Sequence, residues 1–197
     1  MKIGVVSDSH IPDRAVALHP ELLRELQRSN PDLILHGGDI STPGVLKDLT
    51  KIAPVKAVMG NRDWLFAGQL ERTIEFEIEG VKIVLTHGHL NFLTYWWDKM
   101  HYIFKGYDRD RIVRRLSMAF PKADIVVFGH THRAENFRAG EQLFFNPGSV
   151  TVGDIWIRTR SFGIIEIAED GSFQSQIIPL TGYDLVERKW RASSQVS

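Results

Sequence analysis

Six short polar motifs combine carboxylate, imidazole and amide side chains, which are groups that hold transition-metal ions in proteins. The motifs are Asp8-Ser9-His10, Gly38-Asp39, Gly60-Asn61, His87-Gly88-His89, Gly129-His130-Thr131-His132 and Asn146-Pro147-Gly148-Ser149. A single Gly-Asp or Gly-Asn pair is weak evidence, because these residues commonly form turns. The fifth motif is more specific, since alternate residues of an extended segment point the same way and two imidazoles can reach adjacent ions. Together the six motifs predict a metal-binding site.

The donor set indicates which metals this site would hold. The candidate ligands are two aspartates, one asparagine and four histidines, namely Asp8, Asp39, Asn61, His10, His87, His130 and His132, and the chain has no cysteine. Such a mixed oxygen and nitrogen set suits Mn, Fe, Co, Ni or Zn better than Ca or a structural Zn. We expect two divalent transition-metal ions, with manganese as the first choice. Two ions ~3.5–4 Å apart can share a hydroxide and clamp the oxygens around a phosphorus atom.

Hydrophobic runs precede five of the motifs and predict the strands that position them. The runs are residues 3–6, 33–35, 55–59, 81–85 and 125–128, and each has the length and branched-residue content of a buried strand. Polar groups just past the carboxyl ends of sheet strands lie along the edge where open α/β sheets bind ligands. Five strand ends are therefore predicted to converge on one pocket.

The remaining pattern predicts an α/β fold. Residues 18–26 and 45–49 carry apolar side chains at helical spacing, and these helices alternate with the first three strands. Turn pairs at Glu79-Gly80 and Asp170-Gly171 predict two hairpins, and further strands are expected at 142–145, 162–167 and 174–179. The chain has 197 residues, enough for one sizeable core. We expect a single domain over residues 1–188, with residues 189–197 forming a polar tail that frays.

In this order, the motifs resemble those of the calcineurin-like metallophosphoesterase superfamily. Chain length and the Asn146-Pro147-Gly148-Ser149 segment place the resemblance closest to its small YfcE/Vps29-type phosphodiesterases, and it covers almost the whole chain. It implies a four-layer α-β-β-α sandwich of two mixed β-sheets flanked by helices. It further implies one ion held by Asp8, His10, Asp39 and His132, and a second held by Asp39, Asn61, His87 and His130, with Asp39 bridging.

The activity that the resemblance implies is that of a metal-dependent phosphodiesterase, a hydrolase in which a metal-bridging hydroxide attacks a phosphate ester. The substrate is expected to be a small-molecule or nucleotide-like phosphate ester. Two alternatives stay open: a non-catalytic, metal-binding interaction scaffold of the Vps29 type, and a phosphomonoesterase. Retention of every ligand position favours the enzyme over the scaffold.

One position departs from the larger members of the superfamily. Those carry Gly-Asn-His-Asp or Gly-Asn-His-Glu, whose histidine is thought to protonate the leaving group, whereas this chain reads Gly60-Asn61-Arg62-Asp63. Arginine stays protonated, so Arg62 either grips phosphate oxygens and stabilises the transition state, or pairs with Asp63 or a surface carboxylate. Activated leaving groups are therefore favoured. The candidate catalytic residues are Asn61, Arg62 and His89, of which His89 either supports a ligand, the interpretation we favour, or donates to phosphate.

The most individual stretch is residues 91–107, an aromatic-rich insertion between two ligand motifs. It contains Phe92, Tyr95, Trp96, Trp97, Tyr102 and Phe104. Three interpretations compete: a wall that stacks an aryl group or base of the substrate, a lid or homo-oligomer contact, and a helix packed on the core. Association is favoured over substrate contact, because exposed aromatic clusters more often mark interfaces. The arginines at 109, 111, 114 and 115 are predicted to form the charged side of a helix.

Charge and hydropathy argue against two classes of partner. The chain carries 24 basic and 24 acidic residues, so it lacks the basic excess of a duplex nucleic-acid binder. No run approaches about twenty apolar residues, so no membrane segment is predicted. Met1-Lys2 leads directly into a strand without an amino-terminal signal pattern, and a cytoplasmic location is expected.

Overall fold

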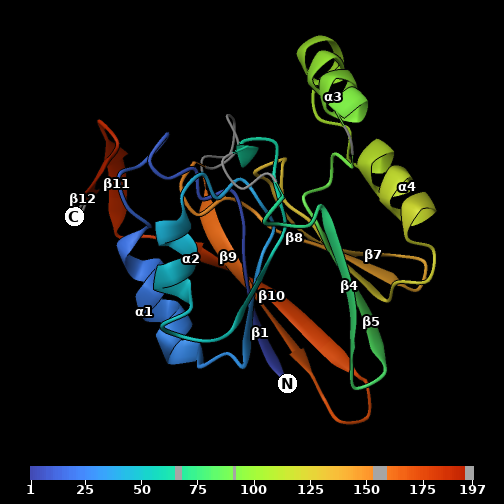
Figure 1. The fold of residues 1–197 in the computed structure, drawn as a ribbon. Helices are drawn as coiled ribbons and strands as arrows, with labels where there is room; N and C mark the ends of the chain where they lie inside the picture. Colours follow the sequence, from blue (N-terminus) through green and yellow to red (C-terminus); the bar gives the residue numbers. More distant parts are fainter. Residues whose placement is uncertain (65–67, 91, 153–158, 194–197) are drawn as a thin grey trace.

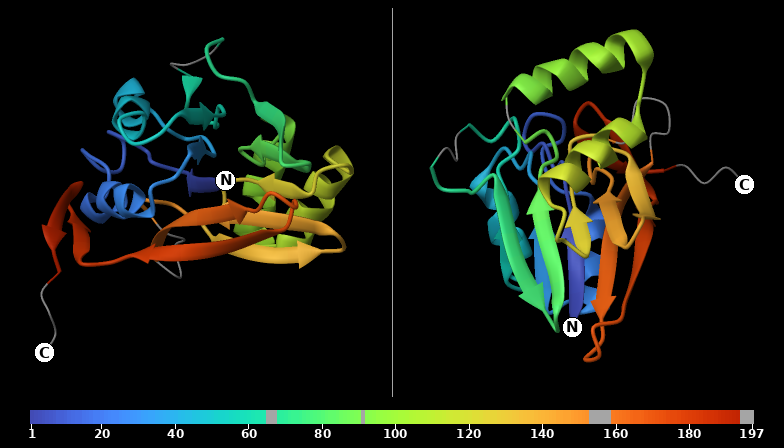
Figure 2. Two further views of the ribbon diagram at one scale, coloured as in Figure 1. Left: turned by 90° about the horizontal axis from the view of Figure 1, so that it is seen from below. Right: turned by 90° about the vertical axis from the view of Figure 1, so that its right-hand side faces the viewer.

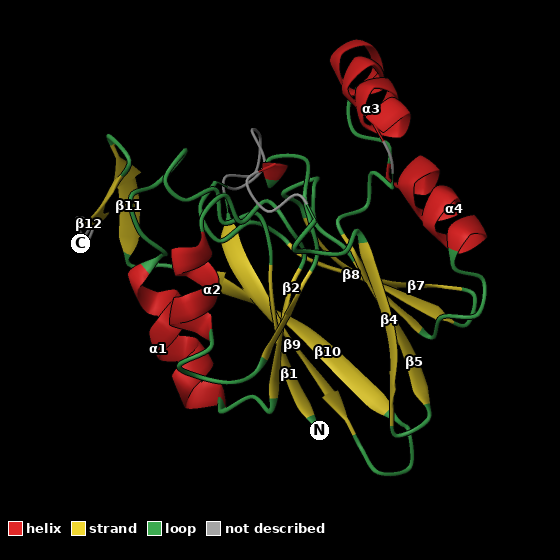
Figure 3. Ribbon diagram, viewed as in Figure 1, coloured by secondary structure: helices red, strands yellow, loops and turns green. Residues whose placement is uncertain are grey.

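The computed structural model describes residues 1–64, 68–90, 92–152 and 159–193 (Figure 1). Residue 91 of the predicted insertion and residues 194–197 of the predicted tail lie outside this range, as do the side chains of Phe92 and Tyr95. Within it, two five-stranded β-sheets are stacked on one another, with helices on their outer faces (Figure 3).

The first sheet has the strand order β10-β9-β1-β2-β3. Strands β1 (Lys2–Val6), β2 (Leu33–His36) and β3 (Val55–Ala57) run parallel, while β9 (Arg160–Ile167) is antiparallel both to β1 and to β10 (Phe173–Leu180). Helices α1 (Pro20–Ser29) and α2 (Pro43–Leu49) make the two crossovers between the parallel strands. Parallel neighbours need such crossovers, and the two helices were predicted between these strands.

The second sheet has the strand order β4-β5-β6-β8-β7. Strands β4 (Thr73–Ile78) and β5 (Val81–Thr86) form the predicted hairpin, and β7 (Ala134–Ala139) and β8 (Gln142–Pro147) form another at the opposite edge. Between them lies β6 (Ile125–Val127), parallel to both β5 and β8. Helices α3 (Phe92–Lys105) and α4 (Arg109–Ala119) connect β5 to β6. Both sheets are therefore mixed.

Apolar side chains fill three layers between these elements. The sheets meet through alternate residues of their strands, including Ile3, Leu35, Leu85, Val127 and Phe145. On the outer face of the first sheet, Leu22 and Leu26 of α1 and Leu49 of α2 are fully buried. On the outer face of the second, Leu116 of α4 packs with Phe128 and Phe144. Because central strands such as β1, β2 and β6 are covered on both faces, their sequences are continuous hydrophobic runs. The predicted four-layer α-β-β-α sandwich is confirmed.

The carboxyl-terminal segment corrects one prediction. Residues 189–192 do not fray: they form β12 (Lys189–Ala192), which pairs with β11 (Tyr183–Val186) in a two-stranded ribbon. Trp190 explains the difference, because its ring packs against His19 at a centroid distance of 4.6 Å and its Nε1 donates a hydrogen bond to the carbonyl of Ala17. One anchored aromatic side chain is enough to tie a polar terminus to a domain.

Helix α3 stands apart from the rest of the chain. It lies at the end of the molecule where β1 and β5 finish, beyond α4 (Figure 1; Figure 2, right). Most of its apolar side chains are exposed, with Leu93 79% and Phe104 76% accessible, whereas Tyr102 is half-buried. The interpretation of this segment as a helix packed on the core is therefore wrong, whereas the other two interpretations stay open. In the described part of the chain, no helix is both long and apolar enough to cross a membrane.

Candidate metal centre

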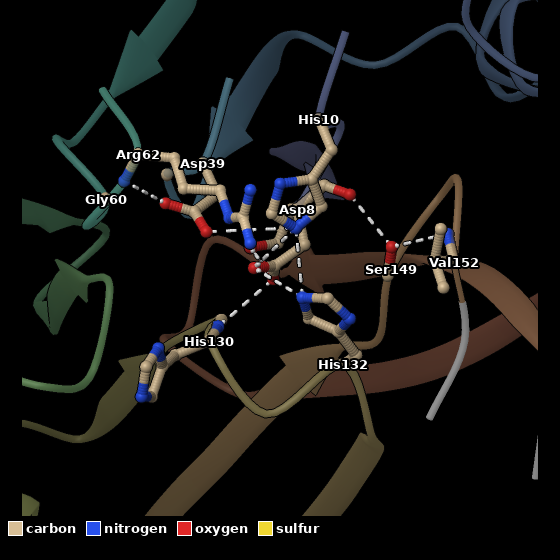
Figure 4. Close-up of polar contacts among 12 residues, drawn as sticks. Asp8, His10, Asp39, Gly60, Arg62, His130, His132, Ser149 and Val152 are labelled. Carbon is tan, nitrogen blue, oxygen red and sulfur yellow. Dashed lines mark hydrogen bonds and ion pairs between the residues drawn. The ribbon is translucent and has the colours of Figure 1, made fainter. Parts of the chain in front are cut away.

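The seven predicted ligands meet at one end of the stacked sheets. Each follows the carboxyl end of a strand: Asp8 and His10 follow β1, Asp39 follows β2, Asn61 follows β3, His87 follows β5, and His130 and His132 follow β6. Figure 4 shows Asp8, His10, Asp39 and His132, drawn from three loops, with their side chains pointing toward one another, while the ring of His130 points away from these four. The structure therefore brings together all seven predicted metal ligands.

The first group of donors surrounds Asp8 and His10. His10 Nε2 lies 3.0 Å from His132 Nε2, and Asp8 Oδ1 lies 3.4 Å from His132 Nε2 and 3.9 Å from His10 Nε2. Asp39 adds its Oδ2 atom at 3.7 Å from His10 Nε2. Four donor atoms from three loops thus face a common point, as the ligands of one ion would.

The second group lies on the other side of Asp39. Asn61 Oδ1 is 3.1 Å from His87 Nε2 and 3.1 Å from His130 Nδ1. Asp39 Oδ1 is 3.6 Å from His87 Nε2. The two oxygens of one carboxylate therefore face two different groups of donors, which is the arrangement that a carboxylate bridging two ions requires.

The chemistry of these groups fits divalent metal ions. No donor in the described part of the chain hydrogen-bonds Asp8 Oδ1, although Asp8 is fully buried. A buried carboxylate oxygen without a partner is costly, and a cation would satisfy it. Burial lowers the pKa of His10 to about 3 and that of His130 well below its ordinary value. Both rings are therefore neutral near pH 7, the form that binds metals.

The two carboxylates differ in their electrostatics. Burial raises the pKa of Asp39 to about 6, which the positive potential of His87 only partly offsets. Burial acts in the same direction on Asp8, but His132, His87 and His10 together lower its pKa below the ordinary value. Asp39 is thus the carboxylate that most needs a nearby cation to stay ionised, and it is the one shared by both donor groups.

Backbone conformation at the site is unusual. Five of the seven ligands have positive φ angles: Asp8 (54°), His10 (50°), Asp39 (54°), His130 (71°) and His132 (59°). Non-glycine residues rarely adopt this region, and each instance costs about 1–3 kcal/mol, so such residues persist where the surroundings hold them and cluster at functional sites. The backbone therefore turns these side chains inward at a cost to stability.

Surrounding groups hold the ligands in place. His87 Nδ1 is 2.6 Å from the carbonyl oxygen of Gly37, which fixes the ring so that Nε2 faces Asp39 and Asn61. Asp63, raised above as a possible partner of Arg62, uses its carboxylate to accept three backbone N–H bonds. They come from Ile40 (2.7 Å), Ser41 (2.8 Å) and Gly60 (2.8 Å), so Asp63 joins the loop of Asp39 to that of Asn61.

The segment from Asn146 to Ser149 supports two ligand loops without supplying a ligand. Asn146 Nδ2 donates to the carbonyl of Gly129 (2.9 Å) and to Thr131 Oγ1 (3.1 Å), inside the loop that carries His130 and His132. Ser149 Oγ donates to the carbonyl of Asp8 at 2.8 Å (Figure 4). The sixth motif thus positions residues of the first and the fifth.

His89 and Arg62 lie beside the ligands. The ring centroid of His89 is 5.3 Å from that of His87 and 5.6 Å from that of His130, and these three rings form a further potential donor group. The Arg62 side chain points toward Asp39 and His10 (Figure 4). Its Nη1 atom is 3.7 Å from Asp13 Oδ2, and Asp63 is occupied by backbone donors. Arg62 therefore makes a loose surface ion pair while facing the site.

A cavity of about 590 Å³ opens from the donor groups toward α3 and α4. Its walls include residues that the motifs did not nominate: Arg14, Lys99, His101, Tyr102, Tyr107 and Arg111. Tyr102 belongs to the aromatic insertion, whose composition already indicated a possible substrate contact. Arg14 could not be predicted from the sequence, because a single arginine in a loop has no distinguishing pattern.

Known proteins of similar sequence place the chain in a family. Residues 1–170 match the model of the calcineurin-like phosphoesterase superfamily domain. The chain is 36% identical to a probable metallophosphoesterase of Methanothermobacter thermautotrophicus, over 77% of this chain and 78% of the relative. It is 26% identical to a phosphodiesterase of Methanocaldococcus jannaschii, over 75% and 83%. A zinc complex of Vps29 from Entamoeba histolytica shares the fold, with a TM-score of 0.68 and 25% identity over 92% of this chain and 100% of that one. The chain belongs to the calcineurin-like phosphoesterase superfamily.

Proposed function

We propose that the protein is a phosphodiesterase that uses two divalent metal ions. The single observation that carries this proposal is the position of Asp39, whose Oδ1 and Oδ2 atoms face two separate groups of donors. Membership of the phosphoesterase superfamily supports hydrolysis, and the archaeal phosphodiesterase among the relatives supports a diester substrate.

Seven residues would hold the two ions. Asp8, His10, Asp39 and His132 would hold one ion, and Asp39, Asn61, His87 and His130 the other. When bound, two such ions supply a nucleophile at neutral pH and positive charge next to the phosphate oxygens. Asn61 is a neutral ligand, so it adds no negative charge where an anionic phosphate must bind. Manganese is the ion we propose to test first.

Arg62 lies where it can bind a phosphate oxygen. Its guanidinium carries several N–H donors and stays charged, and its ion pair with Asp13 is weak because both side chains are about 40% exposed or more, at 42% and 46%. We assign it the role of holding the phosphate and stabilising charge in the transition state. Arginine does not donate its proton, so Arg62 cannot protonate the leaving group.

One feature of the cavity supports a diester over a monoester. The cavity continues past the donor groups to α3 and α4, which leaves room for a second substituent on phosphorus. Arg62, at the position where larger members of the superfamily have histidine, favours an activated leaving group in either class of ester. A small-molecule or nucleotide-like diester matches the size of the cavity.

The test is hydrolysis of bis(4-nitrophenyl) phosphate by metal-stripped protein, with and without added manganese. We expect turnover only with metal, and none in Asp39→Asn prepared identically. Asp48→Asn is the matched control, because Asp48 lies on the surface of α2 and pairs with Lys51. The metal content of each sample should be measured at the same time. Loss of bound manganese in Asp39→Asn would show that the loss of turnover comes from the missing bridging carboxylate.

Other outcomes identify the two alternatives. Hydrolysis of 4-nitrophenyl phosphate in preference to the diester would make the protein a phosphomonoesterase. Binding of two ions without hydrolysis of either ester would favour an interaction scaffold, the alternative raised by the structural similarity to Vps29.

A further inference from the structure

The cavity reaches well beyond the metal centre. Its volume of about 590 Å³ falls in the ~300–1,000 Å³ range of pockets that bind small organic ligands, whereas a phosphate alone would occupy only one end. At the near end lie the ligands and Arg62. At the far end lie Tyr102 on α3, Tyr107 in the α3–α4 connection, and Arg111 and Ile112 on α4. The insertion therefore forms the wall that a substrate substituent would meet.

Two tyrosines, Tyr102 and Tyr107, line the cavity, and only the ring of Tyr102 is available to stack on a substrate. Tyr107 is already engaged, because its hydroxyl donates to Glu135 Oε1 at 2.7 Å and the Arg133 guanidinium covers its ring at 4.4 Å. Tyr102 is half-buried and lines the cavity, yet no aromatic ring or cation of the described residues packs against it. An aromatic face exposed to a cavity is a surface on which a planar group can stack.

Ion pairs hold this wall in place. Asp98 on α3 accepts two hydrogen bonds from Arg115 Nη1, at 2.8 and 2.7 Å, and lies 3.0 Å from Arg111 Nη2. Both arginines belong to α4, which packs on the second sheet. Asp98 thereby fixes the orientation of α3, and with it Tyr102, relative to the sandwich.

The wall is also positively charged. Arg14, Arg62, Lys99 and Arg111 line the cavity, whereas its carboxylates outside the metal centre are Asp98 and Asp108. Asp98 pairs with Arg111 and with Arg115, and Asp108 lies 3.7 Å from His101 and caps α4. With Arg111 thus paired, Arg14, Arg62 and Lys99 still outnumber Asp108, and this positive charge favours an anionic substrate.

We propose that Tyr102 stacks a planar, base-like substituent of an anionic diester, so that the substrate class is nucleotide-like. This inference rests on the proposed phosphodiesterase function. The tryptophans of the insertion do not have this role: Trp97 is 68% exposed, lies beside Arg111 and does not line the cavity. The aromatic wall is therefore made by a tyrosine that faces inward, while Trp97 faces solvent on the same helix.

Calorimetry tests the proposal with two probes that differ only in the base. Adenosine 5′-monophosphate and ribose 5-phosphate are each titrated into manganese-loaded protein. Stacking of one base on an aromatic side chain contributes about 1–3 kcal/mol, so we expect the nucleotide to bind about 5- to 150-fold more tightly than the sugar phosphate. Tyr102→Ala should remove this difference, Tyr102→Phe should keep it, and Trp97→Ala, the matched control from the same helix, should keep it.

The outcomes separate this inference from the proposed function. Equal affinity for the two probes in the unaltered protein, or a difference that survives in Tyr102→Ala, would overturn the role of Tyr102. Absence of turnover with any metal, together with a base-dependent affinity that needs Tyr102, would overturn the phosphodiesterase and leave the nucleotide site standing. Circular dichroism and manganese content of Tyr102→Ala should match those of Trp97→Ala, which shows that neither change disturbs the fold or the metal centre.

Discussion

Asp63 offers the sharpest test of how the loops at the metal centre are held together. It is fully buried and carries no predicted metal-binding role, but its carboxylate accepts N–H bonds from Ile40, Ser41 and Gly60. Ile40 follows Asp39 and Gly60 precedes Asn61, so one side chain sets the spacing of two ligands. Replacing Asp63 with asparagine keeps the size of the side chain and removes its charge.

The size of the effect follows from the three bonds. In Asp63→Asn the amide oxygen can still accept from Ile40 and Ser41, but the amide nitrogen then faces the N–H of Gly60 and leaves that donor unpaired. An unpaired buried donor costs ~1–3 kcal/mol, and bonds to a neutral acceptor are ~1 kcal/mol weaker than bonds to a charged one. We therefore expect the free energy of unfolding of metal-free protein to fall by about 3–5 kcal/mol, a large part of the ~5–15 kcal/mol typical of a domain.

Urea unfolding of metal-stripped protein measures this loss, and manganese titration of the same samples should show at least tenfold weaker binding. Asp170→Asn is the matched control, because Asp170 also accepts a backbone bond, from Ser172, but lies in an exposed turn where water can replace it. A loss below about 1 kcal/mol in Asp63→Asn would refute the reasoning, since the three donors would then have found other partners.

Three further predictions concern single residues. Arg62→Ala should lower kcat for an aryl phosphodiester ~10-fold or more through loss of one transition-state donor, and unchanged kinetics would remove Arg62 from the mechanism. Gly60→Ala should abolish tight manganese binding in calorimetry, because its Cβ would collide with the backbone and carboxylate of Asp39, whereas Gly44→Ala, with open space around it, should bind normally. Burial lowers the pKa of His19 from 6.5 to about 4, with Arg160 acting in the same direction and Glu21 opposing it. Between pH 6.5 and about pH 4, His19 is protonated in the unfolded chain but stays neutral in the folded chain. The free energy of unfolding is therefore nearly unaffected by His19 at pH 7 and is lower by about 2 kcal/mol at pH 5. In urea unfolding, His19→Asn should lack this share of the pH dependence while keeping an acceptor at the N-terminus of α1; equal pH dependence would contradict the assignment.

Much of the fold was predictable because its central strands are buried on both faces. Runs such as Ile3–Val6 and Ile125–Phe128 contain no polar side chain, and each is followed by a polar motif. The position of the site follows from that order, since parallel strands end at the same edge of a sheet. The hairpin turns at Glu79-Gly80 and Asp170-Gly171 were equally visible.

Strand β7 and the β11-β12 ribbon were not predictable, although the other edge strands, β3, β4 and β10, were. Strand β7, with the sequence Ala-Glu-Asn-Phe-Arg-Ala, is half-polar, and every second residue is exposed. The β11-β12 ribbon is held mainly by Trp190 against His19, a contact between residues far apart in sequence. A half-polar edge strand has only one neighbouring strand and little burial, so it lacks a clear hydrophobic pattern in the sequence. A contact between distant residues likewise leaves no local pattern.

Within the site, the sequence identified which residues meet but not how they are supported. The positive φ angles at Asp8 and Asp39, the three bonds to Asp63 and the division of the Asp39 oxygens all depend on loops that approach from separate strands. None of these features leaves a periodic pattern. They also share a cause: the loops must bring carboxylates and imidazoles within about 4 Å of one another in the interior, which strains the backbone and buries Asp39, and burial raises the pKa of Asp39. A site built this way gains stability when cations bind, so its supports and its ligands should respond together to metal removal.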